Sequence, residues 1–252
     1  MRMHKRGQVT IFMILGIIIV FAFALLYFLN DYYGWTLAPG EFLEEPVLAL
    51  QENVRECVDT VVTEDLRLFG LQGGSFVPVH SFAYQGHDVT FLCSALEDGG
   101  CMNKMFSLDH ATLVLEERVH DRVTDCIDPS FVESKRGYVV TKAPLDVSFD
   151  IDPSTIFVLV DYPVAFSKDG VSRSLSTLAR SLPIPLGELH KVAYDVVQAH
   201  ATGQDFYQLP YMLQRYGRVV IGVDTVDSHT VYSLRTDSSD YVFQFAVEDT
   251  HA

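Results

Sequence analysis

The chain has 252 residues, 48% of them hydrophobic, and its 33 Asp and Glu residues outnumber 18 Lys and Arg to give a net charge of −15. Such an acidic chain is a poor partner for nucleic acid or anionic membrane surfaces, which attract basic proteins. Its length allows one large domain or two small ones, each with a packed core.

An apolar run near the N-terminus, Val9–Leu29, contains no charged side chain. As a helix its 21 residues would extend about 31 Å, roughly the thickness of the hydrocarbon core of a bilayer. We therefore predict a transmembrane helix over residues 9–29, followed by a juxtamembrane linker over residues 30–40. A cleaved secretory signal is the alternative, although its apolar core is usually only about 7–15 residues long.

The charges around this run predict its orientation. Arg2, Lys5 and Arg6 precede it without an acidic residue, and acidic residues follow it before the next basic one. The positive-inside rule then places the basic start, residues 1–8, in the cytoplasm and residues 30–252 outside. The predicted location is the cell membrane, with a single span and an extracellular body.

The segment Lys5-Arg6-Gly7-Gln8, followed at once by the apolar run, resembles the class III signal of archaeal type IV pilin-like proteins. In that family a membrane peptidase cuts after the glycine, and the retained helix forms the core of a filament. The resemblance implies processing between Gly7 and Gln8 and self-assembly through the N-terminal helix. Pilins often carry a glutamate five residues into the mature chain, where this sequence has Phe12. An ordinary membrane anchor with a basic start is the alternative.

The rest of the chain shows two kinds of periodicity. Apolar residues at three- and four-residue steps predict helices over residues 42–69, 107–126, 186–201 and 205–216. Alternation and turn signals predict strands over residues 75–84, 88–93, 145–151, 155–166, 171–182, 218–225, 230–234 and 241–247.

These elements predict an α+β fold, in which the transmembrane helix precedes an ectodomain of antiparallel β-strands packed with three to four helices. We divide the ectodomain into a helix–hairpin–helix subdomain over residues 41–128 and a second part over residues 129–252. The second part holds a β-meander, a helix and the C-terminal strands.

Two further segments carry a second resemblance. Leu68–Gly74 and the closing run Tyr241–Val247, together with Cys57 and Cys126 near two predicted helices, resemble a group of uncharacterised membrane-anchored proteins from small-genome archaea. That resemblance implies an archaeal surface protein and brings no known activity.

Four cysteines lie beyond the apolar run, an even number that is typical of a disulfide framework outside the cytoplasm. Antiparallel packing of two predicted helices would pair Cys57 with Cys126. Cys93 and Cys101 flank a glycine-containing loop and would pair across it. A zinc site or unpaired buried thiols are the alternatives, but the sequence has no Cys-x2-Cys spacing.

Signals for catalysis are weak in this sequence. It contains none of the common motifs for zinc proteases, serine hydrolases, dinucleotide binding or phosphate loops. His80 and His87 flank the first predicted hairpin turn, and acidic pairs in turns do not match the twelve-residue calcium loop. We therefore predict no catalytic residue, no metal site and no cofactor, and we expect a protein that is not an enzyme.

Two functions remain after these observations. The first is a pilin-like, membrane-anchored cell-surface protein with a structural or adhesive role. Its expected partners are the membrane, other copies of the chain and cell-surface or envelope proteins, but not nucleic acid. The alternative is an anchored extracellular sensor, an envelope-associated protein or an unrecognised hydrolase.

Overall fold

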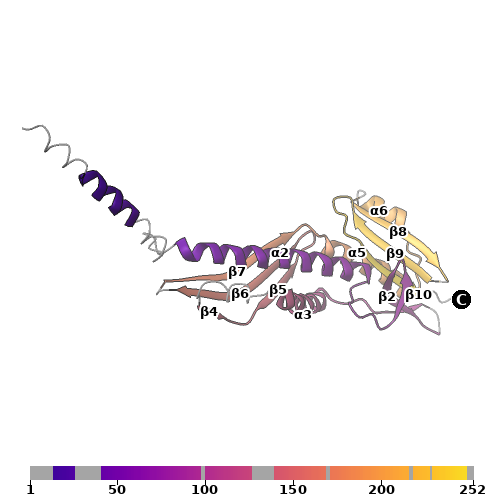
Figure 1. The fold of residues 1–252 in the computed structure, drawn as a ribbon. Helices are drawn as coiled ribbons and strands as arrows, with labels where there is room; N and C mark the ends of the chain where they lie inside the picture. The colour runs from indigo at the N-terminus through magenta and orange to yellow at the C-terminus, as the bar shows by residue number, and fades with distance from the viewer. Residues whose placement is uncertain are drawn as a thin grey trace, which may run out of the picture.

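The computed structural model describes residues 14–25, 41–97, 100–126, 139–168, 171–215, 218–227 and 229–248. These residues form an α+β fold with two sheets (Figure 1). The predicted processing residues, Gly7 and Gln8, lie outside the described residues.

The N-terminal apolar run is where the sequence-based fold prediction fails. Residues 14–25 are helical, but these twelve residues extend only about 18 Å, well short of a hydrocarbon core of roughly 30 Å. Among the described residues, no helix is both long and apolar enough to cross a membrane. The prediction of a transmembrane helix over residues 9–29 is therefore wrong. It rested on hydropathy over the whole run, whereas the described helix covers only its middle.

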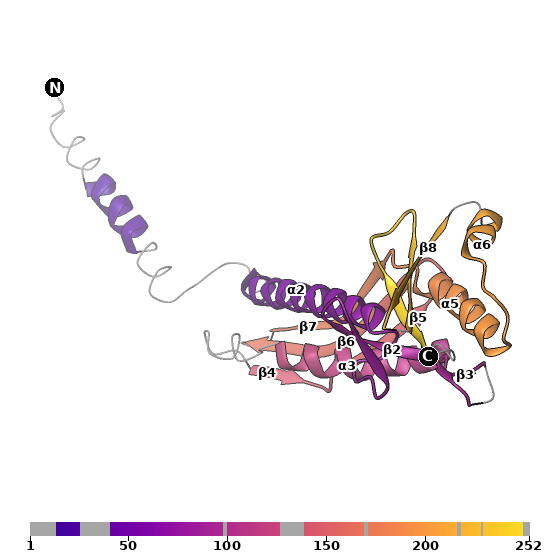
Figure 2. The ribbon, with the colours of Figure 1, turned by 90° about the vertical axis from the view of Figure 1, so that its right-hand side faces the viewer.

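The long helix α2 (Glu41–Leu71) runs lengthwise along the body and reaches both sheets (Figures 1 and 2). Its buried side chains recur at three- and four-residue steps, as the sequence predicts, and include Leu50, Val54, Val58, Val61, Val62, Leu66 and Phe69. Two glycines with positive φ, Gly73 (71°) and Gly74 (86°), turn the chain after the helix, and the Gly74 amide donates to the Phe69 carbonyl at 2.8 Å.

The smaller sheet contains β4 (Val139–Lys142), β5 (Asp146–Ile151), β6 (Ile156–Lys168) and β7 (Val171–Leu182). Strands β4 and β5 pair in succession with one edge of β6, and β7 pairs with its other edge, all antiparallel. The predicted meander over β5, β6 and β7 is confirmed, and β4 was not predicted. Helices α2 and α3 (Leu108–Cys126) cover one face of this sheet. On the other face Phe157 and Leu159 are exposed.

The larger sheet has the strand order β1-β2-β10-β9-β8, and β3 also pairs with β2. Its strands are β1 (Ser81–Tyr84), β2 (His87–Ala95), β3 (Cys101–Asn103), β8 (Val219–Val226), β9 (His229–Thr236) and β10 (Phe243–Glu248). Every pair is antiparallel except β2 with β10, which is parallel. This parallel pair corrects the prediction of purely antiparallel strands.

Helix α5 (Leu186–Ala201) packs against the larger sheet and begins and ends at the predicted residues. The short helix α6 (Gln208–Gln214) lies beside β8. The sequence-based division at residue 128 falls outside the described residues. Strands from both of its sides share the larger sheet, and a single large core cluster takes side chains from both parts.

Candidate functional site

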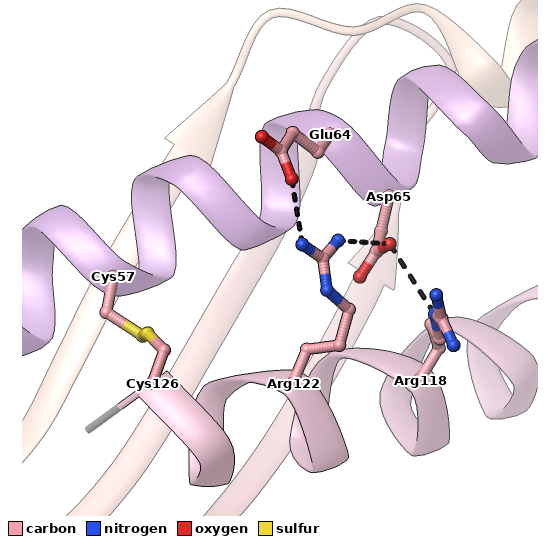
Figure 3. A network of polar contacts seen from close by, with 6 residues as sticks. All are labelled: Cys57, Glu64, Asp65, Arg118, Arg122 and Cys126. Carbon is pink, nitrogen blue, oxygen red and sulfur yellow. Dashed lines mark hydrogen bonds and ion pairs between the residues drawn. A yellow bond between two sulfur atoms is a disulfide. The ribbon is translucent and has the colours of Figure 1, made fainter. Parts of the chain in front are cut away.

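Two disulfides crosslink elements of the body. Cys57 of α2 is joined to Cys126 at the end of α3, with their Cα atoms 6.2 Å apart (Figure 3). Cys93 of β2 is joined to Cys101 of β3, with their Cα atoms 5.3 Å apart. Both separations lie in the usual range for disulfides. The two predicted pairings are confirmed, and neither zinc nor free thiols are needed to account for these four cysteines.

An ion-pair network lies beside the first disulfide, also between α2 and α3 (Figure 3). The carboxylate of Asp65 is 1% exposed and accepts a hydrogen bond of 2.6 Å from Arg122. The same guanidinium donates to Glu64 at 2.8 Å, and the Nε of Arg118 lies 3.6 Å from Asp65. The hydrogen bond to Glu64, and to a smaller extent the one to Asp65, raises the pKa of Arg122. The guanidinium is therefore protonated at any physiological pH.

The contacts at this junction hold α2 against α3. Arg118 also lies over the ring of Phe76, 5.4 Å from its centroid. Its guanidinium therefore makes both a cation–π contact with Phe76 and an ion pair with Asp65. One Asp65 oxygen, Oδ2, is buried without a hydrogen-bond partner in the described part of the chain. No group of three or more His, Cys, Asp or Glu side chains there is arranged to hold a metal ion.

The helix over residues 14–25 is the most exposed apolar feature of the described chain. Every one of its residues is exposed, and none carries a charge. The exposed fractions of its large side chains run from 48% for Ile19 to 73% for Phe21. Contiguous apolar surface of this kind on a protein usually marks a site of interaction.

A small apolar cluster lies on the larger sheet, on the side away from the main core. Val89, Phe91, Val231 and Ala246 form a small separate apolar cluster there, and Phe82 and Tyr84 pack against it. The Tyr84 hydroxyl donates to Asp224 at 2.8 Å, which ties β1 to β8 although they stand at opposite ends of the strand order. The sheet therefore curls around this cluster.

Three polar side chains converge at the border of this small cluster. The Nδ1 of His80 lies 3.1 Å from the Oγ of Ser94, and its Nε2 lies 3.9 Å from the Oε2 of Glu248. Sequence analysis noted His80 beside the hairpin turn but missed its two partners. Ser94 and Glu248 lie 14 and 168 residues further along the chain, so no local motif could have revealed them.

Two other histidines contact backbone carbonyls between packed elements. The Nε2–H of His190 donates to the Phe106 carbonyl at 2.7 Å, and burial lowers the pKa of His190. The Nε2 of His120 lies 3.1 Å from the Leu145 carbonyl. These two rings tie α5 and α3 to neighbouring backbone.

Comparison of the chain with protein-family models, with curated proteins and with solved structures finds no match.

Proposed function

We propose that this chain is a structural or adhesive protein of the cell surface that assembles through its apolar N-terminal helix. The observation that supports this most strongly is the helix over residues 14–25, which is uncharged and exposed on all sides. Burying a large apolar side chain contributes about 1.5–3 kcal/mol, so a helix with many such side chains gains much from packing against others.

The partner we propose for this helix is the same helix in other copies of the chain. A helix in a filament core is surrounded by neighbours and therefore needs apolar side chains all round, as residues 14–25 have. The pilin-like start at Lys5–Gln8 gives a processing route to such a helix, with cleavage between Gly7 and Gln8.

The two disulfides favour a location outside the reducing cytoplasm, because structural disulfides persist in oxidising compartments. The body they fasten would then lie at the surface, where it contacts envelope or cell-surface proteins. The net charge of −15 fits such an exposed, solvated body and disfavours nucleic acid as a partner.

Sedimentation of the purified full-length chain tests the assembly. Phe21→Asp places a charge on the exposed helix face and should convert large, sedimenting assemblies into single chains of 28.3 kDa. Val79→Asp, at a fully exposed apolar residue of the body, is the matched control and should leave the assemblies intact. Equal sedimentation of the Phe21→Asp variant and the parent would refute assembly through this helix.

Processing has a separate test. Gly7→Leu should block cleavage, because a peptidase must approach the backbone at this glycine closely. The intact mass of the parent should then lack residues 1–7, and the variant should retain them. Identical N-termini in the two proteins would exclude processing at Gly7.

A further inference from the structure

We propose that Ser94, His80 and Glu248 form an acyl-transfer site, in which Ser94 is the nucleophile and His80 is the general base. Glu248 positions the imidazole and compensates its charge. The three side chains come from three separate segments: the chain before β1, strand β2 and strand β10. This activity goes beyond the structural role proposed above and does not depend on it.

The pair formed by nucleophile and base has suitable geometry. Ser94 Oγ and His80 Nδ1 are 3.1 Å apart, within the reach of a hydrogen bond that activates a serine. In the tautomer that carries its proton on Nε2, His80 accepts the Ser94 hydroxyl proton at Nδ1. Ser94 is 6% exposed and the His80 side chain is 44% exposed, so a substrate would have to reach the serine hydroxyl from the solvent side of the imidazole.

The third member faces the opposite nitrogen of the ring. Glu248 Oε2 is 3.9 Å from His80 Nε2, an ion-pair distance that becomes favourable when the imidazole takes up a proton. The carboxylate is itself held in place, since the backbone N–H of Ala95 donates to the same oxygen at 3.1 Å. Ala95 directly follows Ser94, so two consecutive residues of β2 supply the nucleophile and hold the Glu248 carboxylate.

Aromatic rings beside the triad indicate the class of substrate. The ring centroids of His80 and Phe91 are 4.6 Å apart, and the ring of His229 lies 4.9 Å from Phe91 and 5.3 Å from Phe82. Apolar rings next to the imidazole favour an uncharged acyl group over a charged one. The inferred substrate is therefore an ester with an uncharged acyl group.

The reaction balances with water as the only co-reactant. The Ser94 Oγ forms a bond to the acyl carbon, its proton passes to His80 Nδ1, and the bond from that carbon to the alcohol oxygen breaks. The departing oxygen takes the proton from His80 and leaves as the alcohol. Water then attacks the acyl-serine, gives a proton to His80 that returns to Ser94, and releases the carboxylic acid.

A fluorophosphonate probe, followed by peptide mass mapping of the oxidised full-length protein, tests the nucleophile. The parent should carry the phosphonyl group on Ser94, and Ser94→Ala should carry none there. His80→Gln should lower the rate of labelling by about 10²–10⁴-fold, the usual contribution of a general base. Ser233→Ala is the matched control and should label as the parent does. Its hydroxyl lies on β9 and is 3.3 Å from Gln244 Nε2.

Hydrolysis of p-nitrophenyl acetate tests the positioning role of Glu248. Glu248→Gln should lower the acylation rate about fivefold, as expected for a partly exposed ion pair, and should change the pH profile. Glu248→Asp should restore much of the rate. Circular dichroism and thermal unfolding establish that each variant is folded.

Two results would overturn the acyl-transfer site. One is a parent protein whose Ser94 is labelled no faster than Ser233. The other is a folded His80→Gln variant that labels at the parental rate. Neither result bears on assembly through residues 14–25, which contribute nothing to this constellation.

Discussion

At the scale of single residues, Asp65 is the least exposed charge at the α2–α3 junction. Its carboxylate is 1% exposed and meets Arg122 at 2.6 Å and Arg118 at 3.6 Å, whose side chains remain about one-third and one-half exposed. A buried carboxylate that loses its closest cation is left poorly solvated, which is the costly way to break an ion pair.

Arg122→Gln should therefore destabilise the protein by about 2 kcal/mol, less than for a fully buried pair because Arg122 is partly in solvent. Arg55→Gln is the control, since its pair with Glu52 at 3.9 Å is exposed on both sides. It should change stability by less than about 0.5 kcal/mol. Urea unfolding under oxidising conditions measures both variants, and equal effects would contradict the role given to Asp65.

Tyr211 makes a prediction about alkaline pH. Burial, and then its 2.6 Å hydrogen bond to Asp195, raise the pKa of Tyr211 to about 12. A raised pKa means that the folded state holds this proton longer than the unfolded state, whose tyrosines ionise near about pH 10. The stability contributed by this group is thus complete below about pH 10 and is lost as the pH rises through about 12.

Absorbance at 295 nm follows this ionisation directly. Tyr211→Phe should remove a phenolate component centred near pH 12 while leaving the components at lower pH unchanged. Tyr207→Phe, a substitution at an exposed tyrosine next to α6, is the control and should leave the component near pH 12 in place. Loss of a component near pH 10 from the Tyr211→Phe variant would contradict the burial argument.

At the scale of elements, the disulfides close loops of different length. Cys57 and Cys126 are separated by 69 residues, and Cys93 and Cys101 by 8. In the chain-entropy treatment these crosslinks stabilise by about 4.4 and 2.5 kcal/mol, because a longer loop loses more freedom in the unfolded chain.

Replacing both cysteines of a pair by alanine should therefore cost more for the helix–helix disulfide than for the strand–strand disulfide. Urea unfolding of the two double variants measures this difference, with the parent under reducing conditions as a reference for the loss of both crosslinks. A larger cost for the pair Cys93–Cys101 would show that local packing, rather than loop closure, dominates.

Elements with strong local signals were predictable from the sequence. Pro183 and Pro185 precede a clean apolar stripe, and α5 runs from Leu186 to Ala201 as predicted. The predicted helix over residues 107–126 starts at a serine, and the Ser107 hydroxyl accepts the His110 amide at 3.2 Å as a cap. These features depend only on neighbouring residues.

Features that depend on distant residues were not predictable. The parallel pairing of β2 with β10 joins residues more than 150 positions apart, and alternation within a strand does not determine its partner or direction. Strand β4 has only four residues, too few for a period to show. The approach of Glu248 to His80 and Ser94 follows from that same parallel pairing, so the sequence offered no signal for it.

At the scale of the whole molecule, the chain combines a body crosslinked by two disulfides with an exposed apolar helix. Two disulfides and the Asp65 network hold α2 against α3 and β2 against β3, and one core cluster extends through both sheets. Residues 14–25 offer instead an apolar surface for other molecules. In the proposed assembly the N-terminal helices would pack together and the bodies would face outward.

Photo-crosslinking at position 21 tests this central claim most directly. A benzophenone side chain in place of Phe21 should join the protein to other copies of itself, giving a ladder at multiples of the mass of one chain, which is 28.3 kDa before processing. The same group in place of Gln85, at the exposed hairpin turn of the body, should give no such ladder. Crosslinks from position 21 to lipid alone, or a ladder of equal strength from both positions, would contradict assembly through the N-terminal helix.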